Sequence, residues 1–146
     1  MRFFSVLLTG LYLVAVTGWE TDFESAKNKA DSEHKLILLN FSGSDWCGPC
    51  IRLHDEIFGS PSFKDFADKN LVLVNADFPR LSKNQLSKDQ QKKNDKLADI
   101  YNPGGSFPLT LLLDARGKVI MTWDGFPNTS PEQFTSQLKD FVNARN

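Results

Sequence analysis

Two short apolar runs, 36–41 and 71–76, constrain the fold of this chain more than any other feature. Each run is almost continuously apolar, which is typical of strands that are covered on both faces of a sheet. The segment between the runs is long enough for a helical crossover, so the two strands are predicted to lie parallel. The pattern therefore predicts an α/β fold with helices on both faces of a central sheet.

The remaining segments carry helical and hairpin patterns. Apolar residues at spacings of three and four predict helices over 21–33, 47–58, 62–69, 89–101 and 131–144. Two further strands, 109–113 and 119–123, flank a turn in which Gly117 is placed for a positive φ, as in an antiparallel hairpin. The predicted sheet is therefore mixed, with one parallel pair and one hairpin.

Some details of these helices follow from single residues. Thr21 and Glu24 have the spacing of a capping box at the start of the first helix. Ile51 and Ile100 fall on the apolar sides of their helices and are predicted to face the core. Ser130 is predicted to cap the last helix, with a proline at its first position.

The first 18 residues differ from the rest of the chain. Arg2 gives a positive start, 3–16 is almost entirely apolar, and small residues lead to Gly18. This layout is typical of a secretory signal peptide, and it is shorter than the roughly 20 residues of a membrane-spanning helix. We expect cleavage after Gly18, a mature domain of residues 19–146 without a membrane span, and export to the periplasm. An uncleaved N-terminal anchor is the alternative.

Length and charge limit the partners that this chain is expected to bind. The 146 residues suit a single domain, which we expect to be a monomer. The formal net charge of −1 gives no strong field for nucleic acid or for an anionic membrane. Lysines do gather within 78–96, which predicts a solvated loop leading into a helix. A docking surface for an acidic partner is the alternative interpretation of that segment.

Cys47 and Cys50 are the two cysteines of the chain, and they lie at a predicted strand-to-helix junction. A disulfide between them closes too small a ring to stabilise the fold much, because this stabilisation grows with loop length. A helix N-terminus favours the thiolate of Cys47, and the thiolate is the form that attacks disulfides. Cys50, one turn later, can close an intramolecular disulfide. We therefore expect Cys47 to attack and Cys50 to resolve.

Residues beside the cysteines are expected to support this chemistry. Gly48 and Pro49 lie in the first helical turn, where proline is tolerated, and Pro49 stiffens the pair. Trp46 is expected to form an apolar wall for a docked polypeptide. Asp45 is predicted to cap the helix that carries the motif.

A metal site is a competing interpretation of the cysteines. His54 lies one helical turn beyond Cys50 and is the candidate for a third ligand. Structural zinc takes four ligands, and the sequence has no second pair of Cys or His residues. We therefore expect neither a metal nor an organic cofactor.

The string Trp-Cys-Gly-Pro-Cys at 46–50 and the predicted element order resemble the thioredoxin superfamily, over about 21–143. The resemblance implies a thioredoxin fold. It also implies a cis peptide bond before Pro108, which faces the cysteines and leaves the Phe107 backbone free to pair with a bound peptide. Trp46, Phe107 and Pro108 are therefore the expected substrate-binding residues.

Two further segments point to one branch of this superfamily. The sequences at 41–47 and 124–126 are similar to small exported bacterial thioredoxin-like proteins. They are also similar to the C-terminal domain of transmembrane thiol:disulfide interchange reductases. The Cys-Gly-Pro-Cys form of the motif is the usually reducing one, which favours a reductase.

The chain departs from the family pattern at two positions. Thioredoxin carries a buried carboxylate on the strand before the motif, where it assists proton transfer at the resolving thiol; the nearest residue here is Asn40. Asn cannot take up a proton, so Asp45 or Glu56 acts instead through water, or the assistance is absent. Phe107 is bulkier than the residue common before this proline, which narrows access to Cys47 and favours apolar peptide.

Two functions remain compatible with the sequence. The first is an exported thiol–disulfide oxidoreductase that acts on protein or peptide disulfides and exchanges electrons with an upstream redox partner. The second is an exported, chaperone-like polypeptide-binding module with the same fold and no redox turnover. Replacing Cys50 by Ser distinguishes them, because an enzyme would then trap substrates covalently through Cys47.

Overall fold

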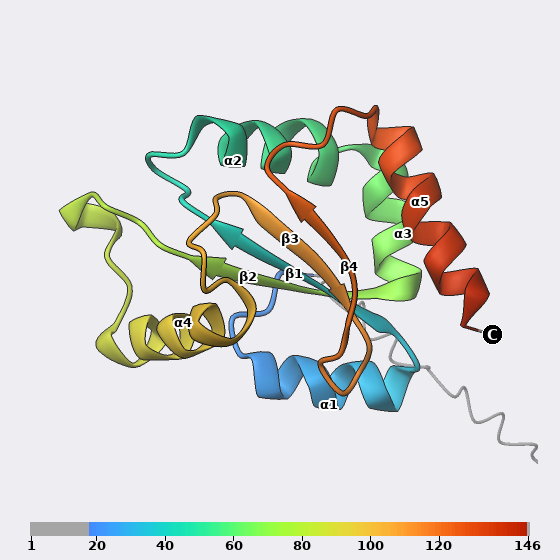
Figure 1. Cartoon of the computed structure of the whole chain (residues 1–146), viewed down its shortest axis with the longest axis horizontal. Coiled ribbons are helices and arrows are strands. Elements are labelled where there is room, and N and C mark those ends of the chain that lie inside the picture. The colour runs from blue at the N-terminus through green and yellow to red at the C-terminus, as the bar shows by residue number, and fades with distance from the viewer. Residues whose placement is uncertain (1–17, 146) are drawn as a thin grey trace, which may run out of the picture.

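The computed structural model describes residues 18–145, and its centre is a four-stranded sheet (Figure 1). The strands lie in the spatial order β2-β1-β3-β4, with bounds β1 Leu36–Ser42, β2 Leu71–Asp77, β3 Leu109–Leu113 and β4 Val119–Asp124. β1 is parallel to β2 and antiparallel to β3, and β3 and β4 form an antiparallel hairpin. The predicted mixed sheet is confirmed. The predicted signal peptide lies, except for Gly18, outside the described residues.

Helices cover both faces of this sheet, as the sequence predicts (Figure 1). The helical segments are α1 Phe23–Glu33, α2 Gly48–Arg52, the π-helical η1 Leu53–Phe58, α3 Pro61–Asn70, the 3-10 turn η2 Ser82–Asn84, α4 Lys88–Tyr101 and α5 Pro131–Ala144. α1 and α4 pack on one face, whereas η1, α3 and α5 pack on the other. The predicted class, a thioredoxin fold with a mixed sheet between helical layers, is confirmed.

Side chains of β1 alternate between the two helical layers, because successive residues of a strand point to opposite faces. Ile37 and Leu39 belong to the buried cluster beneath α1 and α4. Leu36 and Leu38 belong to the cluster beneath η1, α3 and α5. Asn40 continues the second set, so its side chain lies on the face that carries the cysteine motif.

Capping interactions fix the starts of the first and last helices. The side chain of Asp22 accepts a hydrogen bond from the Ser25 N–H at 2.8 Å, so Asp22 caps α1. The predicted cap at Thr21 is therefore wrong by one residue. At α5 the predicted cap is confirmed, since Ser130 and Gln133 form a capping box.

Two isoleucines that were expected in the core are exposed. Ile51 is 43% exposed and Ile100 is 69% exposed. Ile51 lies just before the chain changes from α2 to η1, and Leu53 and Ile57 take the buried side instead. Ile100 lies in the last turn of α4, where Leu97 makes the core contact.

The π-helical segment η1 ends at Gly59. A Cβ atom at this glycine would lie 2.6 Å from the backbone oxygen of Asp55. The widened turn of η1 therefore leaves no room for a side chain at its end. This close approach explains why the segment is followed by glycine.

The topology brings the motif helix to one edge of the sheet. Ser42 and Asp77 end the parallel strands β1 and β2 side by side, and the loop after Ser42 leads directly into α2. Pro108 begins the approach to β3 at the same edge. Within residues 18–145, no helix combines the length and apolar character needed to cross a membrane.

Candidate active site

Cys47 and Cys50 form a disulfide at the start of α2, with their Cα atoms 5.2 Å apart. Cys47 is the N-cap of the helix, and its Sγ accepts a hydrogen bond from the Cys50 N–H at 3.3 Å. The Sγ of Cys50 accepts a hydrogen bond from the Gly43 N–H at 3.5 Å. Backbone donors thus point at both sulfurs. Cys47 is 5% exposed and Cys50 is 3% exposed, so the surrounding residues control access to them.

Gly48 and Pro49 occupy the first turn of α2, between the cysteines, and both are exposed. The proline costs no helical hydrogen bond there, because first-turn N–H groups have no partner within the helix. A Cβ atom at Gly48 would meet nothing within 4 Å. The surface over this turn is therefore open, whereas the two cysteines themselves are buried.

The peptide bond between Phe107 and Pro108 is cis, which confirms the geometry that the family resemblance implies. Pro108 is buried, and its carbonyl oxygen accepts a hydrogen bond from the Gly125 N–H at 2.9 Å. The ring of Phe107 lies 5.4 Å from the ring of Trp46, centroid to centroid. The structure therefore brings two of the predicted substrate-binding side chains together, and one of them, Trp46, directly precedes Cys47.

Trp46 is held on several sides. Its Nε1–H donates a hydrogen bond to the Phe78 carbonyl oxygen at 2.7 Å. The guanidinium of Arg80 lies 3.7 Å from the ring centroid, a cation–π arrangement. A Cβ atom at Gly43 would overlap the indole ring, so the ring lies directly against the glycine backbone. Trp46 is therefore a fixed wall of the site.

Phe78 completes this wall, since its ring lies 5.5 Å from the ring of Phe107 in an edge-to-face arrangement. We call Trp46, Phe78 and Phe107 the aromatic face. Edge-to-face aromatic pairs each contribute about 0.5–1.5 kcal/mol beyond the area that they bury. The aromatic face is thus a packed, apolar surface next to Cys47.

Asp45 does not cap the motif helix, so that prediction is wrong; the N-cap is Cys47 itself. The Asp45 carboxylate instead accepts hydrogen bonds from the N–H groups of Arg80 and Leu81, both at 2.9 Å, and from Asn84 Nδ2 at 3.1 Å. The Arg80 N–H is the largest cause that holds the pKa of Asp45 below its usual range. Asp45 therefore fixes the loop that places Arg80 over Trp46.

A second carboxylate, Asp77, anchors the loop before the motif. It accepts hydrogen bonds from the Ser44 N–H at 2.9 Å and from the Ser44 hydroxyl at 2.5 Å. Its own carbonyl oxygen accepts a hydrogen bond from the buried Asn94 of α4. The loop between β1 and α2 is thus tied to the end of β2.

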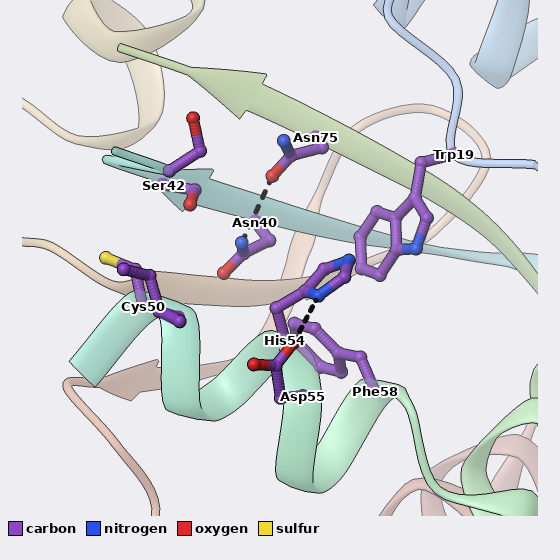
Figure 2. Close-up of a pocket in the computed structure, with 10 residues that line it drawn as sticks. Trp19, Asn40, Ser42, Cys50, His54, Asp55, Phe58 and Asn75 are labelled. Carbon is purple, nitrogen blue, oxygen red and sulfur yellow. Dashed lines mark hydrogen bonds and ion pairs between the residues drawn. The ribbon is translucent and has the colours of Figure 1, made fainter. Parts of the chain in front are cut away.

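On the other side of the disulfide lies a pocket of about 400 Å³, which we call the Cys50 pocket (Figure 2). It is lined by Trp19, Asn40, Ser42, Ser44, Cys50, Ile51, His54, Asp55, Phe58 and Asn75. Figure 2 shows the helix residues on one side of the pocket and the two asparagines of the sheet on the other. The rings of Trp19 and Phe58, 5.0 Å apart, form its aromatic end.

Asn40 belongs to a hydrogen-bonded row that crosses three strands. Its Nδ2 donates to Asn75 Oδ1 at 3.2 Å, and its Oδ1 accepts from the Thr110 hydroxyl at 3.0 Å. Asn75 and Thr110 are its partners in the registers of β2 and β3. Asn40 is only 6% exposed, so the row replaces the expected buried carboxylate with paired neutral groups.

Neither carboxylate that was expected to substitute for this missing acid lines the Cys50 pocket. Asp45 is bound to the loop at Arg80. Glu56 lies on the surface, where a bidentate hydrogen bond from Arg52 is the largest cause that lowers its pKa. The proposed substitution through water at these two residues has no geometric support.

Sequence patterns did not single out several residues that shape the site. Gly43 admits the indole ring, Phe78 accepts its hydrogen bond, and Asn75 pairs with Asn40. Asp77 is the one with a readable signal, because it ends the apolar run 71–76 and parallel strands end at the same edge of a sheet. In the part of the chain that the structure describes, no group of three or more His, Cys, Asp or Glu side chains could hold a metal ion.

The model of the thioredoxin-like domain matches residues 23–142, and the chain belongs to this family. The disulfide bond reductase DsbH of Chlamydia pneumoniae is 36% identical over 127 residues, 87% of this chain and 74% of that protein. A solved DsbH oxidoreductase aligns with a TM-score of 0.77 at 32% identity, covering 97% of this chain and 95% of that one. With its Cys47–Cys50 disulfide, the chain is a thiol–disulfide oxidoreductase.

A more distant structure supports the fold alone. The C-terminal domain of DsbD from Neisseria meningitidis, in the oxidised form, gives a TM-score of 0.54 at 15% identity, covering 80% of this chain and 89% of that one. The likeness to interchange reductases that the sequence suggested is thus found at the level of the fold. The predicted superfamily is confirmed.

Proposed function

We propose that the protein reduces disulfide bonds in exported polypeptides, with Cys47 as the attacking thiolate and Cys50 as the resolving thiol. The observation that carries the proposal is the hydrogen bond from the Cys50 N–H to Cys47 Sγ at 3.3 Å. In the reduced protein the same donor stabilises a thiolate at Cys47, because hydrogen bonds to charged acceptors are the stronger ones. The similarity to a disulfide bond reductase supports the reducing direction.

The reaction has two exchange steps. The Cys47 thiolate attacks one sulfur of the substrate disulfide, a mixed disulfide forms, and the other substrate sulfur leaves as a thiolate. Cys50 then loses its proton and attacks Cys47, which closes the Cys47–Cys50 bond and releases the second substrate thiolate. Two electrons pass from the dithiol to the substrate. An upstream partner must return two electrons to the Cys47–Cys50 disulfide before the next cycle.

The substrate is proposed to lie along the aromatic face and the segment at Phe107 and Pro108. Among the described residues, the Phe107 N–H makes no hydrogen bond, so it is free to pair with an extended peptide. The apolar rings of Trp46 and Phe107 favour apolar residues next to the substrate cysteine. Export is proposed from the apolar segment 3–16, which places this activity in the periplasm.

Trapping tests this proposal. The Cys50→Ser variant, reduced and mixed with a disulfide-bonded protein, should form a covalent adduct at Cys47 that thiol reagents reverse. The Cys47→Ser variant should form none. If neither variant forms adducts, the chain is a polypeptide-binding module and the proposal is wrong.

The reduction potential tests the direction of electron flow. Equilibration of the Cys47–Cys50 pair with glutathione should give a value near that of thioredoxin, about −270 mV. A value near about −120 mV would instead indicate an oxidant that introduces disulfides.

A further inference from the structure

The resolving step needs a route for one proton. Before Cys50 attacks, its thiol must lose a proton, since the thiolate is the reactive form. Cys50 is 3% exposed, and Asn40, the buried polar residue beside it, cannot accept a proton. Because Cys50 lines the Cys50 pocket, the proton can leave the sulfur in that direction.

Besides Cys50, the pocket lining holds one pair of side chains that can take up a proton. Apart from Cys50, the titratable residues among the lining are His54 and Asp55. The remaining polar groups are the carboxamides of Asn40 and Asn75 and two serine hydroxyls, which can relay a proton but do not keep it. The pocket of about 400 Å³ carries these polar groups beside its apolar residues and has room for several waters at about 30 Å³ each, so a chain of water can join Cys50 to His54.

The helix places these residues on one side. Cys50, Ile51, His54, Asp55 and Phe58 all line the pocket, at the spacings of a single helical face. His54 and Asp55 belong to the π-helical segment η1, and Figure 2 shows both side chains on the pocket side of it. The helix that activates Cys47 at its start therefore also carries an acid–base pair beneath Cys50.

His54 is suited to pass a proton between the pocket and bulk water. Its Nδ1 lies 3.1 Å from Asp55 Oδ1. A carboxylate only accepts hydrogen bonds, so Nδ1 carries the hydrogen and Nε2 is left to accept a proton. The His54 side chain is 72% exposed, so the acquired proton can then reach bulk water.

The charged groups that face His54 lie on η1 and α3. Asp55 faces it from η1, and Lys64 and Asp68 of α3 line a second hollow that His54 also lines. The groups that face it from β1, β2 and the loop before the motif are neutral. Histidine is the side chain best suited to exchange protons near neutral pH.

We infer that His54, oriented by Asp55, accepts the Cys50 proton through pocket water and thereby replaces the missing buried carboxylate. The Cys50 S–H bond breaks, its electron pair forms the bond to Cys47, and the Cys47 bond to the substrate sulfur breaks. The electron pair of that broken bond leaves with the substrate thiolate, and the proton passes to His54 Nε2. His54 acts on Cys50 through water and does not touch the reacting sulfurs, so it is a positioning residue for the second step. The inference rests on the proposed role of Cys50 as the resolving thiol.

Stopped-flow reaction with dithiobis(nitrobenzoate) separates the two steps. Attack by Cys47 on this aromatic disulfide releases one coloured thiolate, and resolution by Cys50 releases the second. The His54→Gln variant should slow the second release by about tenfold, below the ~10²–10⁴ of direct proton transfer because water intervenes. The first release should be unchanged. The pH profile of the second release should also differ from that of the wild type, and added imidazole should restore part of the lost rate.

Matched variants make the outcome decisive. Asp55→Asn should slow the second release by less than His54→Gln does, because His54 itself remains. Glu56→Gln, the next residue along η1 but outside the pocket lining, should leave both releases unchanged. An unchanged second release in His54→Gln, or equal slowing of both releases, would overturn the inference. If the wild-type protein releases only the first thiolate, the resolving role of Cys50 is wrong. That result would contradict the proposed function itself and not only the role of His54.

Discussion

The two sides of the Cys47–Cys50 disulfide are built in opposite ways. On the Cys47 side, the aromatic face is packed ring against ring, and Trp46 is held by the Phe78 carbonyl oxygen and covered by Arg80. On the Cys50 side, the chain leaves a pocket of about 400 Å³ lined by carboxamides, hydroxyls and two aromatic rings. The Cys47 side is closely packed, whereas the Cys50 side leaves room for water.

This difference matches the different needs of the two sulfurs. In the proposed mechanism the sulfur of Cys47 attacks a polypeptide that must be held in one orientation, which a rigid apolar wall with a free backbone donor can do. In the proposed mechanism the sulfur of Cys50 does not bond to substrate but must exchange a proton, which a pocket with room for water permits. We therefore expect substitutions on the Cys47 side to affect packing and substrate binding, and substitutions on the Cys50 side to affect charge and proton transfer.

The largest expected effect is that of Gly43→Ala, which tests how tightly the aromatic face is packed. The new Cβ would overlap the indole of Trp46, whose hydrogen bond to Phe78 and cover by Arg80 resist displacement. Overpacking of this kind costs about 3 kcal/mol of unfolding free energy. Urea unfolding measures it. Gly104→Ala, where a Cβ meets nothing within 4 Å, is the control and should change stability by less than about 0.5 kcal/mol.

The next effect is that of Asn40→Asp, which places a charge beneath Cys50. The change removes the hydrogen bond donor to Asn75 and buries a carboxylate, at a cost of about 2 kcal/mol near pH 7.5. Burial raises the pKa of the introduced carboxyl above its unfolded value of about 3.9. The unfolded state then binds fewer protons, so the variant loses stability relative to the wild type as pH rises above about 4.

Unfolding of this variant at pH 4 and at pH 7.5 gives the measurement. Asn75→Asp is the control. Position 75 is only half-buried, so the introduced carboxylate keeps some solvation and the pH dependence should be weaker. A loss of stability that is the same at both pH values would contradict this, because it would show that the introduced carboxylate stays well solvated at position 40.

A smaller effect is expected for Phe107→Leu, which removes two edge-to-face contacts of the aromatic face. The expected loss of stability is about 1 kcal/mol. The KM for a disulfide-bonded peptide should rise severalfold, while the first release from dithiobis(nitrobenzoate) stays the same. Equal changes for peptide and small disulfide would mean that Phe107 shields Cys47 rather than binding substrate.

The smallest effect is expected for Asp45→Asn, which acts on the loop that carries Arg80. The pKa of Asp45 is lowered, chiefly by the Arg80 N–H, so its stabilising effect is present above the unfolded pKa and is lost as pH falls through the folded pKa. Amide hydrogen exchange at Arg80 and Leu81 should therefore be faster in the variant at neutral pH and should converge with the wild type in acid. If amide exchange in the variant is faster than in the wild type by the same factor at every pH, this prediction is wrong.

Much of the fold could be predicted because its signals are local. The apolar runs of β1 and β2, the cap at Ser130 and the turn at Gly117 each follow from a few neighbouring residues; Gly117 has a φ of 88°. The cap of α1 shows the limit of such signals. Thr21 and Asp22 are both good caps, and only the path of the chain before the helix decides between them.

The parts of the site that escaped prediction depend on contacts between distant segments. Asp45 bonds to residues 35 and more positions away in the sequence, across a loop whose shape no local pattern encodes. Ile51 precedes Leu53 by two residues, which a helix places on nearly opposite sides, and it lines the Cys50 pocket, to which Trp19 also contributes.

The widened turn at η1 also makes the motif helix sensitive to chain length. A π-helical hydrogen bond spans one residue more than an α-helical one, so deleting a single residue from Leu53–Phe58 would restore α-helical spacing. One residue corresponds to about 100° of helical rotation, which would carry His54 and Asp55 around the helix relative to Phe58. Gly59, which the end of η1 requires, gives a sequence marker for this arrangement. Related chains that keep a histidine four residues after the second cysteine and a glycine nine residues after it are expected to share the pocket, whereas chains one residue shorter there are not.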